Sequence, residues 1–335
     1  MRRYKSDDYT FASAYIRCQE KYFLNSEKAE KMLEAKTPDE ALRVLFELNY
    51  GDGSSEVSAL EFESLLSREL EKAYELVLPL APDREYFVIF LYPNDYHNVK
   101  ALLKAEFLGI NADELLVNTG SIPLAKLIDL VQNRNYPDMR LEMAKGILEV
   151  VDTYGTTRNP QVIDLILDKA CYRDINTEIS KVKNSFVRGY VALKIDTINL
   201  KSFVRAREMG KSWDFFSSIY IEGGNIAERL FINSYDEPFE QFADKLGIYG
   251  LSEAMQEGAS MLKESGRFTD LEKFCDNLLM KYIRDAKYIT IGVEPLLAYL
   301  AAKENEAKMV RIIMAGKLAN IPTEKIRERM RDTYA

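Results

Sequence analysis

The chain has 335 residues, of which 47% are hydrophobic and 29% charged, a balance that supports a packed core and excludes an intrinsically disordered protein. The formal net charge of −8 argues against a nucleic-acid partner, because a negative surface repels the phosphate backbone. With only 16 glycines and 10 prolines, the chain has few turn-forming residues for an all-β protein, so long helices with short connections are expected.

The N-terminus, the hydropathy and the cysteines predict the compartment. The chain begins Met-Arg-Arg-Tyr-Lys-Ser-Asp-Asp, without the apolar region of a secretory signal. No stretch approaches the ~20 apolar residues of a membrane-spanning helix. Cys18, Cys171 and Cys275 lie far apart, with no CxxC motif, and predict reduced thiols that pack in the core. We therefore expect a soluble protein on the cytosolic side.

Helix-start signals occur along the whole chain. In Thr37-Pro38-Asp39-Glu40, Thr37 is placed as an N-cap, Pro38 as the first helical residue and Glu40 as the acid of a capping box. Similar signals recur at Asn111 with Glu114, at Asn159 with Pro160, and at Thr269 with Glu272. Each of them predicts the beginning of a helix.

Apolar residues recur at helical spacing between these starts, along residues 62–77 and 163–170. The segment Tyr86-Phe-Val-Ile-Phe-Leu-Tyr92 is the exception. Its β-branched and aromatic residues suit a buried strand, and periodicity alone does not distinguish that strand from a buried helix.

An internal repeat is the most informative feature of the sequence. Residues 95–105, which begin with Asp95 and carry Asn98, are echoed by residues 196–206 and, more weakly, by residues 306–316. A second marker, Leu-Glu/Asp-Lys followed by Ala or Phe, begins at residues 70, 167 and 271, with nearly the same period. The two markers together predict three related helical domains, at residues 1–110, 111–222 and 223–335.

Each copy of the repeat carries basic residues beside an inward apolar stripe. Asp95 and Asp196 are placed as helix N-caps. The cations that follow them predict a basic edge that contacts an acidic partner: Lys100, Lys104, Lys201, Arg205, Arg207 and Arg311. The alternative is that these side chains extend along the apolar surface and pair with carboxylates of the same molecule.

Motifs for catalysis are absent from the sequence. With His97 as the single histidine, placed in the first turn of its helix, no Ser/His/Asp triad or multi-histidine metal site can be built. No phosphate-binding loop occurs, and the glycines at residues 51–53 and 223–224 predict turns. We therefore expect no catalytic, cofactor-binding or metal-binding residue, no small-molecule substrate and no enzyme activity.

The C-terminal residues closely resemble the C-subunit family of prokaryotic V-type or archaeal-type ATPases, which includes the d subunit of the eukaryotic vacuolar pump. The most specific block is Glu294-Pro295 with Tyr299, inside residues 286–306. Further matching segments are residues 310–313, 316–318, 326–329, 95–105, 40–45 and 49–51. The resemblance covers essentially the whole chain.

The resemblance implies an all-α funnel of three similar domains around a pseudo-threefold axis. Such a protein stands between the central shaft of the soluble ATPase head and the cytoplasmic loops of the membrane proteolipid ring. It transmits torque and is peripherally attached to the membrane through the complex. By analogy, residues 86–92 are helical. The third copy departs from the pattern, because Met309 stands where the other copies have Asn98 and Asn199.

Two other classes of protein remain open at this stage. A helical-repeat adaptor unrelated to rotary ATPases would form an open solenoid with a concave groove. An uncharacterised enzyme would show a deep pocket with carboxylates of shifted pKa.

Overall fold

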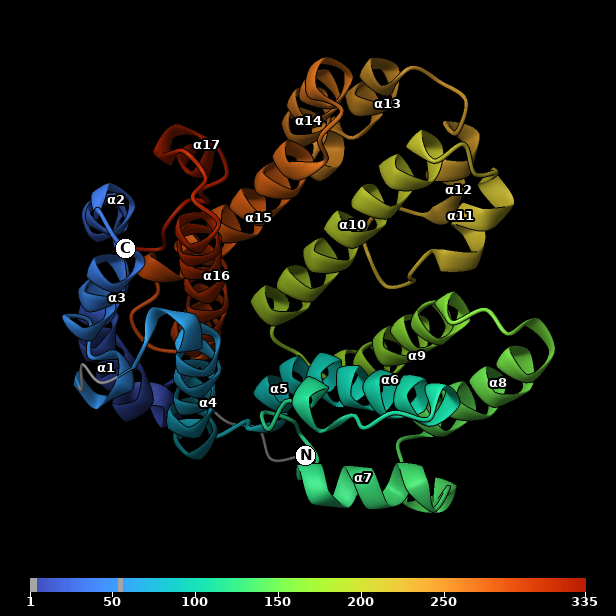
Figure 1. Ribbon diagram of the computed structural model, residues 1–335, viewed down its shortest axis with the longest axis horizontal. Coiled ribbons are helices and arrows are strands. Elements are labelled where there is room, and N and C mark those ends of the chain that lie inside the picture. The colour runs from blue at the N-terminus through green and yellow to red at the C-terminus, as the bar shows by residue number, and fades with distance from the viewer. Residues whose placement is uncertain (1–4, 54–56) are drawn as a thin grey trace. The chain divides into compact units, whose positions relative to one another are not determined.

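The computed structural model describes residues 5–53 and 57–335, without the side chains of residues 6, 52, 53 and 263–265, and those residues form an all-α protein (Figure 1). No strand occurs in the described ranges, so the expected all-α class is confirmed. Residues 1–4, the beginning of the segment predicted to lack a secretory signal, lie outside them.

The chain divides into two compact units. The terminal unit combines the described residues up to Arg84 with Glu237–Ala335, and the central unit is Glu85–Asp236. The α-helices of the terminal unit are α1 (Thr10–Gln19), α2 (Ser26–Glu34), α3 (Pro38–Phe46), α4 (Phe62–Leu80), α13 (Phe239–Lys245), α14 (Ser252–Ser265), α15 (Thr269–Arg284), α16 (Val293–Leu318) and α17 (Thr323–Glu328). Its 3₁₀ turns are η1 (Ser6–Tyr9), η2 (Glu20–Tyr22), η3 (Tyr50–Gly53), η4 (Ala59–Glu61), η8 (Gly247–Tyr249) and η9 (Asp285–Tyr288).

The central unit is also entirely helical in its regular structure. Its α-helices are α5 (Glu85–Val88), α6 (Tyr92–Leu108), α7 (Leu124–Gln132), α8 (Leu141–Thr157), α9 (Gln161–Ile179), α10 (Ser185–Glu208), α11 (Trp213–Ile219) and α12 (Glu228–Asn233). Its 3₁₀ turns are η5 (Ile89–Leu91), η6 (Asp113–Leu115) and η7 (Tyr136–Asp138).

Helix α16 is the centre of the terminal unit. It packs against α1, α3, α4 and α15, and most of its residues are buried. These neighbours on several sides of the helix bury even the charged side chains of Lys303 and Glu306. Its side chains Val310 and Ile313 join Leu33, Leu42 and Leu45 in one fully buried cluster.

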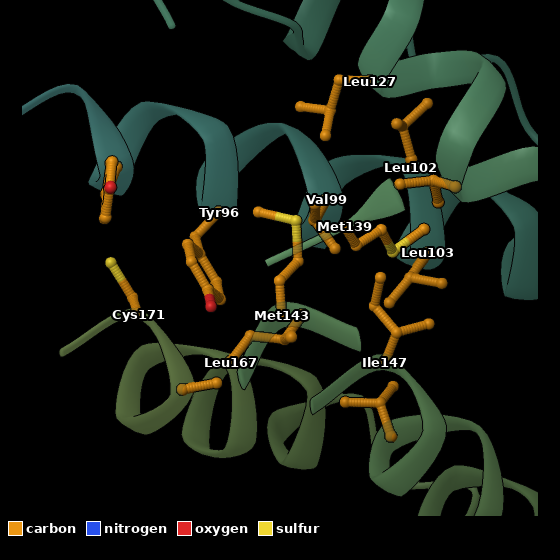
Figure 2. Close-up of a cluster of buried hydrophobic side chains, with 14 of the residues drawn as sticks. Tyr96, Val99, Leu102, Leu103, Leu127, Met139, Met143, Ile147, Leu167 and Cys171 are labelled. Carbon is orange, nitrogen blue, oxygen red and sulfur yellow. The ribbon is translucent and has the colours of Figure 1, made fainter. Parts of the chain in front are cut away.

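In the central unit, α8 and α9 lie side by side, and α6 packs on α9 (Figure 1). Figure 2 shows Tyr96, Val99 and Leu103 extending from α6 toward Met143 of α8 and Leu167 of α9. A second, aromatic cluster lies where α10, α11 and α12 meet. In it, the ring centroid of Phe203 lies 5.4 Å from that of Phe216 and 5.4 Å from that of Phe231.

Several predicted elements are confirmed. Residues 86–92 are helical throughout, in α5, η5 and the first residue of α6. The Thr37 hydroxyl accepts a hydrogen bond from the Glu40 backbone N–H at 3.1 Å, as an N-cap does. The Glu40 carboxylate accepts from the backbone N–H of Lys36 at 2.8 Å, whereas in a standard capping box it would accept from the N–H of the N-cap residue, Thr37. The stripes of α4 and α9 face the core as expected.

Other helix starts differ from the prediction. Asn111 does cap a turn, since its side chain accepts from the Asp113 N–H at 2.8 Å, but only the short η6 follows. Thr269 is the first residue of α15, and Pro160 directly precedes α9. Such shifts of one residue are usual at helix ends.

The N-cap positions predicted in the repeat are wrong. Helix α6 begins at Tyr92, three residues before Asp95, and α10 begins at Ser185, so Asp196 lies in mid-helix. The helical turns that precede Tyr92 carry the chain into α6 early. His97 consequently lies in the second turn of α6, not the first.

The cysteines follow the prediction only in part. Cys171 and Cys275 are buried, whereas Cys18 is exposed on α1. Burial raises the pKa of the Cys171 thiol, which keeps it protonated and unreactive.

Candidate functional site

The six cations predicted to face a partner lie on three helices. Lys100 and Lys104 are on α6, and Lys201, Arg205 and Arg207 are on α10, all in the central unit. Arg311 is on α16 in the terminal unit. Their role in partner binding stays a prediction, but their surroundings define what each can do.

Lys100 and Lys104 form a ladder of ion pairs between α6 and α9. The Lys100 ammonium lies 2.7 Å from an oxygen of Asp168 and 3.8 Å from one of Asp164. Lys104 contacts both oxygens of Asp164 at 2.8 Å. The Lys104 side chain is 37% exposed, so its charge remains within reach of solvent and of a partner. Such half-exposed pairs each contribute at most about 1 kcal/mol to stability.

The α10 cations have less uniform surroundings. Lys201 is half-buried and forms no ion pair with any residue that the structure describes. Arg205 is exposed. The Arg207 guanidinium carbon lies 5.4 Å from the ring centroid of Phe203, in the aromatic cluster, so its side chain also supports packing. Of the α10 cations, Lys201 and Arg205 are the better suited to an external carboxylate.

Arg311 forms a two-pronged pair with Glu63 of α4, with both N···O distances at 2.8 Å. The side chains are 47% and 50% exposed, so the pair lies on the surface of the terminal unit. In both units, therefore, a repeat cation joins its own helix to a neighbouring one.

The Asp and Asn of the first repeat copy have a role that the sequence did not predict. Asp95 is fully buried, and its Oδ1 accepts from the backbone N–H groups of Ser121 at 3.0 Å and Ile122 at 3.2 Å. Asn98 binds both backbone polar groups of one residue, donating to the Val117 carbonyl at 2.8 Å and accepting from the Val117 N–H at 2.9 Å. We call this arrangement of Asp95 and Asn98 on residues 117–122 the first loop clamp.

The second copy repeats these contacts. Asn199 donates to the carbonyl of Ile221 at 2.7 Å and accepts from its N–H at 2.9 Å. Asp196 accepts from the N–H groups of Asn225 and Ile226, both at 3.0 Å. Asp196 and Asn199 on residues 221–226 form the second loop clamp.

A glycine lets each loop approach its carboxylate. A Cβ atom on Gly120 would lie 2.4 Å from Oδ1 of Asp95, and one on Gly224 would lie 2.2 Å from Oδ1 of Asp196. Both distances are far below a normal contact, so only glycine fits while the carboxylate keeps its place. Gly223 and Gly224 lie in irregular bends, in agreement with the predicted turn.

The third copy has a carboxylate but no amide. Glu306, which is 5% exposed, accepts from the backbone N–H of Leu24 at 2.5 Å, from the Tyr50 hydroxyl at 2.5 Å and from the Lys303 ammonium at 2.7 Å. In all three copies the carboxylate accepts from the backbone N–H of the residue two positions before a helix, which we call the gripped residue. These residues are Ile122 before α7, Ile226 before α12 and Leu24 before α2. The C-terminal copy thus grips a segment near the N-terminus.

The three carboxylates differ in how their charge is balanced. Asp95 faces the Arg140 guanidinium at 2.8 Å, and Glu306 faces Lys303. Asp196 is held by neutral donors, and burial raises the pKa of its carboxyl despite the hydrogen bonds from Ile226 and Asn225. Burial, followed by the negative charge of Glu306, raises the pKa of Tyr50 well above its usual range, so the tyrosine hydroxyl remains a hydrogen-bond donor.

A signal for the clamps was present in the sequence. Asp95 and Asn98 are spaced i, i+3 and i+7 with Leu102, on the face that carries the apolar stripe. A polar residue on an inward face must find hydrogen-bond partners when buried. Its partners 19 to 27 residues downstream were not visible in the sequence.

The remaining features bear on catalysis and on membrane insertion. His97 is exposed, and a nitrogen of its ring lies 2.9 Å from the Leu115 carbonyl oxygen. Within the described ranges, no group of three or more His, Cys, Asp or Glu side chains is placed to hold a metal ion. None of the helices in that part of the chain combines the length and the apolar character needed to cross a bilayer.

These observations define an all-α protein whose buried polar side chains hold loops against long helices. Residues 12–329 match the family described as the ATP synthase (C/AC39) subunit, and the chain belongs to that family. It is 24% identical to the C subunit of the V-type sodium ATPase of Enterococcus hirae, over 98% of this chain and 99% of the relative. It is 25% identical to the C subunit of the A-type ATP synthase of Methanocaldococcus jannaschii, over 95% and 85%, respectively. The corresponding A-type ATP synthase protein of Methanococcoides burtonii is 22% identical over 97% and 94%.

Proposed function

We propose that this chain is a non-catalytic rotor subunit of a rotary V-type or A-type ATPase. In this role it couples the central shaft of the soluble head to the cytoplasmic loops of the membrane proteolipid ring, and it is peripherally attached to the membrane on the cytoplasmic side. The observation that carries the proposal is the family match over residues 12–329, together with relatives that bear the name of this ATPase component and align along nearly their whole length.

The loop clamps support a mechanical role. Torque passes without loss only through a body that resists deformation, and close-packed helical interiors do so. Connections between helices are usually the softer parts of a fold. Here the loops at residues 117–122 and 221–226 are each held by buried hydrogen bonds to a long helix, which stiffens the places where such a body would otherwise bend.

The clamps also support the proposal of three related modules. Each module would begin at its gripped residue, Leu24, Ile122 or Ile226, and would end with the long helix α6, α10 or α16. In this scheme Glu306 of the last module grips the beginning of the first, which closes the series. The second and third modules would then begin at residues 122 and 226, and not at the predicted residues 111 and 223.

Omission of the chain tests the coupling role. The other components of the complex would be assembled in vesicles with and without this protein, and ATP hydrolysis and ion uptake measured together. We expect hydrolysis by the head to persist and ATP-driven uptake to be lost without the chain, because torque no longer reaches the ring. Equal uptake in both preparations would contradict the proposal.

The predicted partner surface is tested by charge reversal. Lys201→Glu with Arg205→Glu should weaken assembly, most visibly as salt is raised, because salt screens the charges that remain. The matched control is Lys126→Glu with Lys183→Glu, which reverses two exposed cations of the same unit. Equal assembly of the two double variants would show that the α10 cations do not face a partner.

A further inference from the structure

A groove on the terminal unit carries charge of the opposite sign to the protein as a whole. It has a volume of about 520 Å³ and lies along α16, between α17 and the side of α15 that carries Asp276. Five cations line it, against the single carboxylate of Asp276: Lys308, Arg311, Lys325, Arg329 and Arg331. The chain overall carries −8, so this is a local concentration of positive charge.

The cations form a rim and do not converge on one point. Lys308 and Arg331 share Asp276, at 3.0 and 3.1 Å, and Lys325 pairs with Glu328 at 2.7 Å. Arg311 keeps its two-pronged pair with Glu63 of α4, at 2.8 Å. Arg329 is exposed and forms no ion pair with any residue in the described ranges. A small anion needs several donors directed at one place, which this rim does not offer.

The floor of the groove is apolar and is formed mainly by small side chains. Ile312 and Ala315 share one face of α16, and Ala319, the residue directly after the helix, continues that face, since the three are spaced i, i+3 and i+7. Ala315 and Ala319 are exposed. A Cβ atom on Gly316 would lie 2.7 Å from Ile326 of α17, so glycine allows α17 to pack tightly and form the wall. Small residues on an exposed helix face leave room for another helix to approach.

We propose that this groove docks an acidic amphipathic helix of a partner protein. The apolar face of that helix would cover Ile312, Ala315 and Ala319, while carboxylates on one flank would meet Arg329. Arg311 and Lys308 are already paired with Glu63 and Asp276, but their side chains are about half exposed, so a further carboxylate can approach them. A concave floor with small side chains fits a convex helix, as in other helix-in-groove complexes. The apolar floor has no counterpart in a nucleic-acid backbone, and a flat bilayer does not fill a groove. The inference rests on the proposed function only in taking the partner to be another component of the same complex.

Binding of a designed probe to the isolated full-length chain tests the groove. The probe is a fluorescent synthetic helix about 18 residues long, or about five turns, with Leu on one face and Glu on both flanks of that face. Its counterpart carries Lys in place of Glu. In fluorescence anisotropy we expect the Glu peptide to bind at least about ten-fold more tightly than the Lys peptide, a difference of about 1.4 kcal/mol. Raised salt should reduce that preference.

Two matched double variants locate the site. Ala315→Glu with Arg329→Glu places a carboxylate on the floor and reverses one charge on the rim. It should weaken binding of the Glu peptide at least about ten-fold. Ala125→Glu with Lys126→Glu makes the same change in charge on exposed residues of α7 and should leave binding unchanged. Circular dichroism confirms that both variants keep the fold, which is expected because all four residues are exposed.

Cross-linking provides a second measurement on the unaltered chain. A photoreactive group in the Leu face of the Glu peptide should label residues between Lys308 and Arg331. Labelling elsewhere, equal binding of the two peptides, or equal loss in both double variants would each overturn the proposal. Binding of phosphatidylglycerol vesicles in place of the peptide, lost in the groove variant, would overturn it as well. Because no other protein takes part, failure here leaves the omission experiment on the complex unaffected.

Discussion

Substitution of Asn199 gives the sharpest test of the loop clamps. Asn199→Ala removes two hydrogen bonds to the backbone of Ile221: the one donated to its carbonyl, at 2.7 Å, and the one accepted from its N–H, at 2.9 Å. Asn199 is fully buried and Ile221 is 6% exposed, so water does not readily replace the lost partner. The Ile221 N–H and C=O groups would therefore remain buried without hydrogen bonds.

The expected cost follows from that count. Each buried backbone group left without a partner costs about 1–3 kcal/mol, so the two groups together destabilise the central unit by about 4 kcal/mol. Asn98→Ala should cost less, about 2 kcal/mol, because Val117 is only half-buried and water can reach its backbone N–H and carbonyl groups. The order of the two effects tests the reasoning independently of their size.

The assay uses the single tryptophan of the chain. Trp213 begins α11, eight residues before Ile221, and is 48% exposed, so its fluorescence reports the central unit and not the terminal one. In urea titrations with a slope of about 2 kcal/mol per molar, a loss of about 4 kcal/mol lowers the midpoint by about 2 M. Circular dichroism followed in parallel shows whether the terminal unit unfolds in the same transition.

A matched control separates the clamp from general effects of losing an asparagine. Asn133→Ala removes an exposed amide at the end of α7 and should change stability by less than about 0.5 kcal/mol. A loss below about 1 kcal/mol for Asn199→Ala, or equal losses for Asn199 and Asn133, would refute the view that buried amides fix these loops.

Three further predictions concern the carboxylates of the clamps. In the same urea assay, Gly224→Ala should destabilise the central unit by about 1–3 kcal/mol, because the added methyl group would collide with Asp196. The matched control is Gly155→Ala in α8, where no atom lies within 4 Å of the added methyl group. It should stabilise the unit by about 0.5–1 kcal/mol. Glu306→Ala should lower the free energy of unfolding of the terminal unit by about 3–5 kcal/mol, because Lys303 would stay buried and unpaired. Adding Lys303→Met should recover part of that loss. A double variant less stable than the single one would contradict this explanation. Burial raises the pKa of Asp196, so the folded chain keeps this proton to a higher pH than the unfolded chain does, and the stability from this group is lost as pH rises. The stability of wild type relative to Asp196→Asn should therefore decrease as the pH rises above about 4, the ordinary range of an aspartate. A constant or increasing difference in urea midpoints would refute the assignment.

The sequence by itself determined the fold class, some of the helix starts and the family. The stripes of α4 and α9 follow from a local period, and the Thr37 cap from a contact three residues away, so both could be read from neighbouring residues. The departure of the third copy at Met309 is now intelligible. Counted back from the gripped residue, the position of Ile221 corresponds to Gln19, which lies in α1, where the helix itself takes up the backbone N–H. An amide is not needed there, and Met309 packs in the apolar core.

Only the tertiary structure decided what the repeat does. Asp95 and Asp196 are residues typical of helix caps, yet both are buried within helices and hold loops 25 or more residues away. Lys100 and Lys104 pair with carboxylates on α9, about 60 or more residues further along the chain. No local sequence pattern indicates these pairs. The physical reason is the same in each case. Hydrogen bonds and ion pairs act at about 3 Å, and which residues come that close is fixed by the packing of helices and not by their spacing in the sequence.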